Sequence, residues 1–334
     1  MKTGALLLAG DIGGTKTKLA LYNLVGDRLE ILREDVYKSI HYDGLGGIVI
    51  EFLGDSNPVP NAACFGIAGP VSDGQCRTTN LPWFVEETEI SNQTGIPIVR
   101  LLNDLQAMAI GLSKLPPEEL VELNPDAQTA VGNIAVIAAG TGCGEAMLYW
   151  DGKMHHAIAT EGGHTDFAPN TREQEGLLRS LRIKFGGGHV SYERILSGSG
   201  LYNTYQYLAE ERVAPESPSF REAMLDGEDP GKIIGRLALE ENDPLCRETL
   251  RLFVRVYGAE AGNWALKSLA HGGVLIGGGI AAKILPAITN GDFMASFRDK
   301  GRFSDWMSTL SVKVALNQDA GLLGAAQHAV KLIA

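Results

Sequence analysis

The sequence predicts an α/β protein with two domains, and three observations support this. Short apolar runs typical of buried strands alternate with segments whose apolar residues recur at helical spacing. Most of these strands end in glycines, which favours ligand-binding loops at the strand ends. The chain has 334 residues, of which 45% are hydrophobic, so it can bury a large core. That length fits two domains better than one or three.

The first elements of the chain read as a β-hairpin. Residues 5–9 form a compact apolar run, Gly13 and Gly14 supply a turn, and 16–22 alternates polar and apolar side chains. A second buried strand is predicted at 62–67, where the apolar run stops at a Gly-Pro pair.

A third strand, at 98–102, runs into Asn103 and then into a helical pattern, DLQAMAIGL. We expect Asn103 near the N-cap, because its side chain can accept from the free N–H groups of the first turn. The helix dipole would favour an ionised Asp104 by ~0.3–1 kcal/mol, and an ionised carboxylate is what a general base needs at neutral pH. Asn-Asp before a helix is also a common plain cap, so the dipeptide alone leaves both interpretations open.

The second half of the chain alternates in the same way. Strands are predicted at 134–139 and 145–150, a buried-face helix over 250–269, and a further strand in GGVLIGGGI. The segment 113–133 contains prolines, acids and few large apolar residues, and we expect it to be a passage between the domains.

Three glycine-rich loops follow predicted strands. Missing side chains would let backbone N–H groups approach the phosphates of a nucleotide or, in the third loop, the adenine ring. Thr15 could add a hydroxyl donor, and Asp11 could hold a water on Mg²⁺. Ordinary turns remain the alternative for each loop, since neither a Walker A nor a G-x-G-x-x-G motif is present. The loop residues are Gly10, Asp11, Ile12, Gly13, Gly14 and Thr15; Thr141 and Gly142; and Gly277, Gly278 and Gly279.

Carboxylates and an imidazole gather beside glycines in the middle of the chain. Glu161 and His164 are followed by Asp166 and, further on, by Glu193. Such a group suits sugar hydroxyls, which need hydrogen-bond acceptors as well as donors. A metal site is the alternative, since E-x-x-H can supply two ligands. We favour a sugar, because no cysteine lies near enough in sequence to complete a zinc set.

Composition excludes several classes of partner. The formal charge of −11 and the pI near 5.2 argue against nucleic acid and anionic membranes, both of which need clustered Lys and Arg. The four cysteines are far apart, as expected in a reducing cytosol. The apolar run LLLA is too short for a signal segment or a membrane span. We therefore expect a cytoplasmic protein with a small-molecule substrate.

Eight motifs, taken in this order, closely resemble the bacterial hexokinase-like glucokinases of the actin-like ATPase superfamily. Each string is weak alone, but eight in order over nearly the whole chain make a chance match improbable. They are GDIGGT, FGIAGPV, LLND, AGTGCGEA, EGGHTDFAP, HVSYERILSGSG, LIGGGI and DAGLLGAA.

The resemblance implies the actin-like ATPase (ribonuclease H-like) fold, with two domains and an active-site cleft between them. The small α/β domain would comprise 1–114 with 317–334, and the large α+β domain 115–316. It further implies phosphorylation of glucose at the 6-hydroxyl by ATP and Mg²⁺, and a homodimer.

The resemblance also assigns roles to individual residues. Asp104 would be the catalytic base, and Asn103, Glu161, His164 and Glu193 would hold the glucose hydroxyls. Asn80, in TTNLPW, matches a position near the sugar. The loop 10–15 would hold the ATP phosphates, with Thr141 and Gly142 as its opposite wall. Two positions depart from the family's usual residues: Thr160 stands for a glycine and Ser199 for a proline.

Other functions stay open at this point. Within the kinases, the substrate could be fructose, mannose or an N-acetylated hexose, because specificity depends on fine hydroxyl geometry. A sugar-responsive regulator is disfavoured by the acidic charge and by DIGGT at residue 11, which leaves no room for a DNA-binding head. An actin-like ATPase that binds no sugar would leave the EGGH and SYER clusters unexplained.

Overall fold

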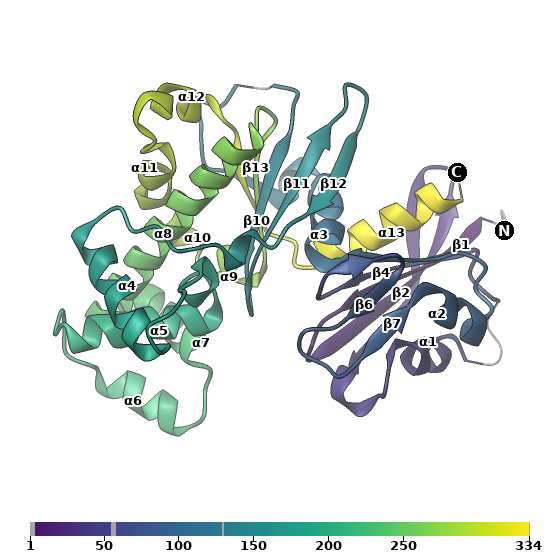
Figure 1. The fold of residues 1–334 in the computed structure, drawn as a ribbon, viewed down its shortest axis with the longest axis horizontal. Helices are drawn as coiled ribbons and strands as arrows, with labels where there is room; N and C mark the ends of the chain where they lie inside the picture. Colours follow the sequence, from purple (N-terminus) through teal and green to yellow (C-terminus); the bar gives the residue numbers. More distant parts are fainter. Residues whose placement is uncertain (1–3, 55–57, 129, 334) are drawn as a thin grey trace. The chain divides into compact units, whose positions relative to one another are not determined.

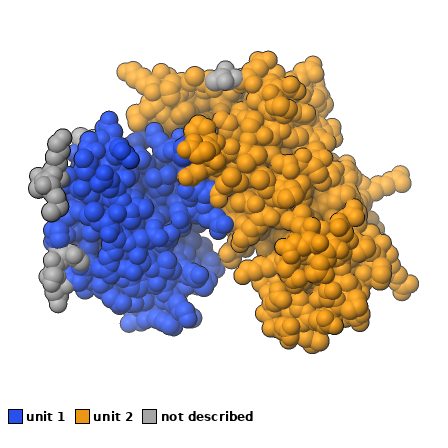
Figure 2. Space-filling model, turned by 180° about the vertical axis from the view of Figure 1, so that it is seen from behind, with its two compact units in different colours: residues 1–116, 157–159, 317–334 blue, residues 117–156, 160–316 orange. Residues whose placement is uncertain are grey.

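The computed structural model describes residues 4–54, 58–128 and 130–333, and these form two compact units (Figure 2). Unit 1 comprises 1–116, 157–159 and 317–334, and unit 2 comprises 117–156 and 160–316. The outer bounds predicted for the small domain, residues 1 and 334, lie outside the described residues.

A five-stranded sheet, in the order β3-β2-β1-β4-β8, forms the centre of unit 1 (Figure 1). β1, β4 and β8 are parallel, and β2 and β3 continue the sheet antiparallel. The predicted hairpin and the strands at 62–67 and 98–102 are therefore confirmed. The strands are β1 (Ala5–Ile12), β2 (Lys16–Val25), β3 (Arg28–Lys38), β4 (Ala62–Ile67) and β8 (Val99–Asn103).

Both faces of this sheet are covered by helices. Leu7 and Ala9 of β1 pack on one face with α3 (Asp104–Leu112) and α13 (Ala320–Leu332). Leu8 and Ile12 point to the other face, toward α1 (Leu45–Leu53) and α2 (Glu87–Thr94). Burial on both sides explains why β1 reads as an unbroken apolar run. A small sheet of β5 (Val71–Ser72), β6 (Gln75–Arg77) and β7 (Phe84–Glu86) adds to the second core.

The helices α3 and α13 pack with their backbones in close approach. A Cβ on Gly111 of α3 would overlap the carbonyl oxygen of Ala320, and a Cβ on Gly324 of α13 would overlap that of Ala107. Glycine at both positions therefore allows the C-terminal helix to seat against the helix that begins at Asp104.

The strands of unit 2 belong to a six-stranded sheet in the order β12-β11-β10-β13-β14-β9, of which residues 157–159 of β12 are counted with unit 1. β10 pairs antiparallel with β11 and parallel with β13, as β1 does with β2 and β4. The two units thus share a strand arrangement although the sequence shows no repeat. The strands are β9 (Leu120–Glu122), β10 (Ile134–Ala139), β11 (Cys143–Trp150), β12 (His155–Ala159), β13 (Gly273–Gly277) and β14 (Val312–Ala315).

A long buried helix, α8 (Pro244–Ser268), lies at the centre of the helical part of unit 2 (Figure 1). It confirms the helix predicted over 250–269 and begins earlier, where Asp243 caps it by accepting from the Cys246 N–H. The other helices are α4 (Arg172–Lys184), α5 (Gly198–Glu210), α6 (Pro218–Leu225), α7 (Pro230–Glu240), α9 (Gly279–Lys283), α10 (Leu285–Ile288), α11 (Asp292–Arg298) and α12 (Ser304–Thr309). Short 3₁₀ turns are η1 (Ser39–His41), η2 (Pro117–Glu119), η3 (Gly162–His164), η4 (Tyr192–Arg194) and η5 (Gly301–Phe303).

Two segments differ from what the sequence predicts. The passage expected over 113–133 holds η2 and β9, and β9 pairs antiparallel with β14 as an edge strand. Three residues are too few to show a period. The sequence does not predict β3 either. Most of its side chains are exposed, and charged residues interrupt the apolar ones, as is common on an edge strand.

Among the helices of the described residues, none combines the length and the apolar character needed to cross a bilayer.

The packing of α3 on α13 predicts the effect of one methyl group. Gly324→Ala should lower the free energy of unfolding by about 1–3 kcal/mol, because overpacking a close contact exceeds the gain in helix propensity. The matched control is Gly235→Ala in α7, where a Cβ would meet only Ile284, at 4.0 Å. That change should be neutral or stabilising by up to about 1 kcal/mol. Urea unfolding of both variants measures the difference, and equal stability of the two would contradict the packing argument.

Candidate functional site

The first glycine loop forms a tight turn between β1 and β2. The Gly13 N–H donates to the Lys16 carbonyl at 2.9 Å, which closes the turn. Asn80 lies directly against it, because a Cβ on Gly14 would be 2.6 Å from the Asn80 Cβ. The structure therefore brings Asn80, predicted near the sugar, to the turn predicted to hold phosphates. Thr15 is exposed at the tip of this turn.

Three members of the predicted phosphate loop, Gly10, Asp11 and Ile12, belong to β1 itself, and Gly10 and Ile12 face its core. A Cβ on Gly10 would come within 2.6 Å of Phe65 and 2.7 Å of Leu19, so the missing side chain here allows core packing. Ile12 is buried in the same core. Only the backbone of these two residues is available to a ligand.

Ser39, which the sequence did not single out, holds the turn from behind. Its hydroxyl donates to the Gly13 carbonyl at 2.9 Å and lies 3.0 Å from the Thr17 hydroxyl, which must then donate to it. Both side chains are fully buried. A serine in a short 3₁₀ turn more than twenty residues further along the chain carries no sequence signal of this role.

Asp11 lies next to the start of α13, where a Cβ on Gly321 would be 3.4 Å from its carboxyl carbon. Burial is the main cause that raises the pKa of Asp11, Asp319 adds to the rise, and Lys18 opposes it. Lys18 in turn pairs with Asp319 at 2.8 Å. A desolvated carboxylate beside a second acid gains from a cation, and oxygen ligands are those that Mg²⁺ prefers. Asp11 therefore fits a role in holding Mg²⁺ through water.

Asn103 ends β8 and caps α3, as predicted. Its Oδ1 accepts from the N–H groups of Leu105 and Gln106 at 3.0 and 3.3 Å, and its Nδ2 donates to the Gly69 carbonyl at 3.1 Å. The acceptor is thus occupied by the helix, and one amide hydrogen remains for a ligand.

Asp104 begins α3 and is half-buried. The Leu105 N–H that donates to Asn103 also donates to the Asp104 Oδ1, at 2.9 Å. Its carboxylate adds to the effect of burial in raising the pKa of the Cys76 thiol.

The three parallel strands of unit 1 bring these residues to one edge. Ile12, Ile67 and Asn103 are register partners across β1, β4 and β8, so the turn predicted to hold phosphates and Asp104 both follow the carboxyl ends of strands in this parallel set. Ligand sites of α/β sheets lie at such an edge.

Unit 2 gathers its two predicted nucleotide loops in the same way. Ala138 and Gly277 are partners in the parallel pair β10–β13, so the loops that follow them are neighbours. Gly278 has φ +83°, and a Cβ there would overlap the Ala139 carbonyl. Gly279 then opens α9. Thr141 is exposed at the loop after β10.

Glu193 joins the predicted sugar cluster to one of these loops. Its Oε2 accepts from the Cys143 N–H at 3.0 Å and lies where a Cβ on Gly142 would be. Glycine at 142 therefore leaves room for this carboxylate. Cys143 is buried, and burial with nearby acids raises its pKa well above the ordinary value, so its thiol is not activated.

Glu161 precedes η3 and His164 ends it, and both are exposed, with 62% and 58% of their side-chain surfaces accessible. The Glu161 Oε2 and His164 Nε2 lie 4.0 Å apart. In the described ranges of the chain, no three His, Cys, Asp or Glu side chains are arranged to hold a metal ion. Both side chains are instead available to hydroxyl groups.

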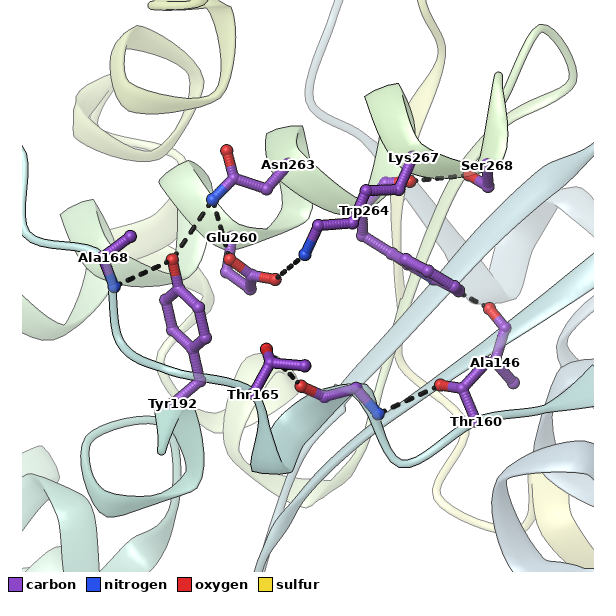
Figure 3. Close-up of polar contacts among 11 residues, drawn as sticks. Ala146, Thr160, Thr165, Ala168, Tyr192, Glu260, Asn263, Trp264, Lys267 and Ser268 are labelled. Carbon is purple, nitrogen blue, oxygen red and sulfur yellow. Dashed lines mark hydrogen bonds and ion pairs between the residues drawn. The ribbon is translucent and has the colours of Figure 1, made fainter. Parts of the chain in front are cut away.

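Two threonines fix the backbone of this turn (Figure 3). Thr160 donates to the Glu145 carbonyl at 2.8 Å and accepts from the Gly162 N–H at 3.2 Å. Thr165 donates to the Gly162 carbonyl at 2.8 Å. The hydroxyl at 160, where the family usually has glycine, therefore ties the turn to β11.

His189 is a further residue that the sequence did not single out. Its Nδ1 lies 2.6 Å from the Asp166 Oδ1, and its Nε2 lies 2.8 Å from the His164 carbonyl oxygen. Both ring nitrogens face acceptors, so the ring holds both contacts at once only as a double donor. His189 thereby links the two sides of the His164–Asp166 segment.

The chain matches the family model described as Glucokinase over residues 8–332. A curated glucokinase from Nostoc punctiforme is 41% identical, with 98% of this chain and 99% of that protein covered. One from Klebsiella pneumoniae strain 342 is 34% identical, with 96% of each covered. The crystal structure of a glucokinase from an Antarctic psychrotroph is 28% identical, with a TM-score of 0.82 over 98% of this chain and 99% of that one. The predicted fold class, the α/β fold of actin-like ATPases, is confirmed.

Proposed function

The chain belongs to the glucokinase family and is an ATP-dependent kinase of glucose, and we propose that Asp104 is its general base. The observation that carries this proposal is the position of Asp104. It directly follows the carboxyl end of β8, in register with the turn after β1, and the hydrogen bonds of Asn103 hold it there. Acceptance of the 6-hydroxyl proton by a positioned carboxylate would contribute about 10²–10⁴ in rate.

The nucleotide would be held by backbone groups. The Gly13 N–H is taken by the Lys16 carbonyl, so the first turn would offer the N–H groups of Gly14 and Thr15. The loop at Thr141 and Gly142 would offer its own, and Gly277–Gly279 would lie against the adenine ring. Mg²⁺, when bound with ATP, would neutralise charge on the phosphates, and Asp11 would hold one of its waters.

The sugar would be held by side chains that differ in what they can offer. Glu161 and Glu193 accept hydrogen bonds, the His164 ring can donate or accept, and Asn103 has one amide hydrogen left to donate. Asn80, against Gly14, would lie where the sugar approaches the phosphates.

The reaction follows from these roles. The 6-hydroxyl oxygen attacks the γ-phosphorus in line, its proton passes to the Asp104 carboxylate, and the bond to the β-phosphate oxygen breaks to release ADP. Positioning and charge neutralisation supply most of the rate, since phosphoryl transfer needs little covalent help.

Three broader features complete the proposal. We infer that the small domain spans 1–114 with 317–334 and the large domain 115–316, that the chain acts in the cytoplasm, and that it forms a homodimer. The acidic charge and the scattered cysteines support the location, and dimers are the commonest assembly of soluble enzymes.

A panel of sugars in a coupled ADP-release assay tests substrate and position together. We expect glucose to have the highest kcat/KM, above fructose, mannose and N-acetylglucosamine, and 6-deoxyglucose to release no ADP because it lacks the attacking oxygen. A higher kcat/KM for another hexose would move the assignment to that sugar, and ADP release with 6-deoxyglucose would contradict transfer to the 6-position.

Asp104→Asn keeps the size and most hydrogen bonds of the side chain but cannot accept the proton. We expect kcat to fall about 10²–10⁴-fold while calorimetry shows nearly unchanged glucose affinity. Asp27→Asn, at an exposed turn of the same unit, is the control for a lost charge. Turnover near that of the wild type would rule out Asp104 as the base.

A further inference from the structure

A second acid, Glu145, lies beneath the turn that carries Glu161 and His164, although its side chain has no role in the proposed reaction. It belongs to β11 and is only 1% exposed. A Cβ on Gly162 would overlap its Oε2, so its carboxyl group is packed against the backbone of η3. The Glu161 and His164 side chains of the same turn are, by contrast, exposed.

Glu145 lacks the partners that a buried charge requires. From the described residues, neither of its carboxyl oxygens receives a hydrogen bond. An ionised carboxylate left so would carry a large desolvation penalty. A protonated carboxyl, by contrast, has an O–H to donate and could satisfy itself against an acceptor.

Glu260 of α8 is the candidate acceptor. It is fully buried, and it is the neighbouring carboxyl that acts most strongly on Glu145. Donors surround it: the Asn263 Nδ2 lies 2.8 Å from its Oε2, and the Lys267 Nζ lies 3.4 Å from its Oε1 (Figure 3). The two acids therefore divide their roles, because Glu260 has donors for a negative charge and Glu145 has none.

We propose that Glu145 is a positioning residue for the sugar-binding turn, and that it acts as a neutral acid whose proton is donated to Glu260. The inference rests on the proposed role of Glu161 and His164 in holding glucose. Thr160 connects the two directly, since it bonds both the Glu145 carbonyl and the Gly162 N–H. The pair, with one proton and one negative charge, thus packs against the backbone of the turn at Gly162.

The pKa of Glu145 is shifted in the direction that favours the protonated acid. Burial raises the pKa of Glu145 to about 8, Glu260 adds to the rise, and Lys267 opposes it. The other titratable groups around the pair are three buried side chains and one half-buried lysine. They are Cys143 on the same strand, Tyr257 on α8, Tyr192 on η4, and Lys300, whose charge acts on Glu260 and whose pKa burial lowers. Loss of the Glu145 proton would place two adjacent negative charges under Gly162 and displace the turn.

Glu145→Gln tests this, since an amide donates to Glu260 at every pH. For the wild type we expect the glucose KM to rise about fivefold to tenfold between about pH 7.5 and about pH 9.5, with a smaller change in kcat. The variant should keep a flat glucose KM over this range. Glu240→Gln, an exposed change of equal charge on α7, should follow the wild type. An alkaline rise of equal size in Glu145→Gln would overturn the proposal.

Glu260→Gln should shift the pH dependence of the glucose KM instead of removing it. Without the neighbouring negative charge, Glu145 would lose its proton at lower pH, so the rise in glucose KM should begin at lower pH than in the wild type. A rise at unchanged or higher pH would contradict the proposed pair. This variant also tests the proposal if Glu145→Gln folds poorly.

Thermal unfolding without substrate separates this inference from the proposed function. The folded-state pKa of Glu145 exceeds its ordinary value of 4.5, so its stabilising effect is complete below that value and is lost as pH rises toward the folded pKa. The unfolding temperature of Glu145→Gln minus that of the wild type should therefore increase between about pH 5 and about pH 8 and stay constant above that. A difference independent of pH would show that Glu145 is not the protonated member, whatever sugar the enzyme uses.

Discussion

The amide of Asn103 joins three parts of unit 1 at a single point. Its oxygen accepts from the N–H groups of Leu105 and Gln106 in the first turn of α3, its nitrogen donates to the Gly69 carbonyl after β4, and its own backbone ends β8. Loss of a cap of this kind costs about 0.5–2 kcal/mol. The more important consequence is geometric, since Leu105 N–H is shared between Asn103 and Asp104 and so fixes the carboxylate to the helix start. The placement of the proposed base depends on this one side chain.

Close backbone approach is the second constraint, and glycine meets it wherever a functional segment is seated on a sheet or helix. Gly142 makes room for the Glu193 carboxylate, and Gly162 makes room for the Glu145 carboxyl group. Gly324 lets α13 settle on the helix that Asp104 begins. At these three positions glycine is needed for space rather than for flexibility.

The sequence predicts strands well where both faces are buried, and the 62–67 and 134–139 runs end at the observed residues. It predicts the Asn103 cap because side-chain chemistry and helical period agree there. The sequence does not predict the two edge strands, because β3 is exposed and rich in charged residues and β9 has only three residues. Contacts between residues far apart in the sequence are not predicted either. The hydrogen bond from Ser39 to Gly13 and the interaction of Glu260 with Glu145 leave no local sequence pattern.

The proposed glucose contact of Asn103 can be separated from its helix cap by rapid-quench single turnover at saturating glucose and Mg-ATP. Asn103→Ser keeps a capping oxygen but lacks the amide donor, whereas Asn103→Ala lacks both. If the cap positions Asp104, the serine variant should transfer phosphate within about tenfold of the wild-type rate, and the alanine variant should be slower than serine by about tenfold or more. Equal transfer rates in the two variants would contradict the account, because the cap would then have no part in placing the base.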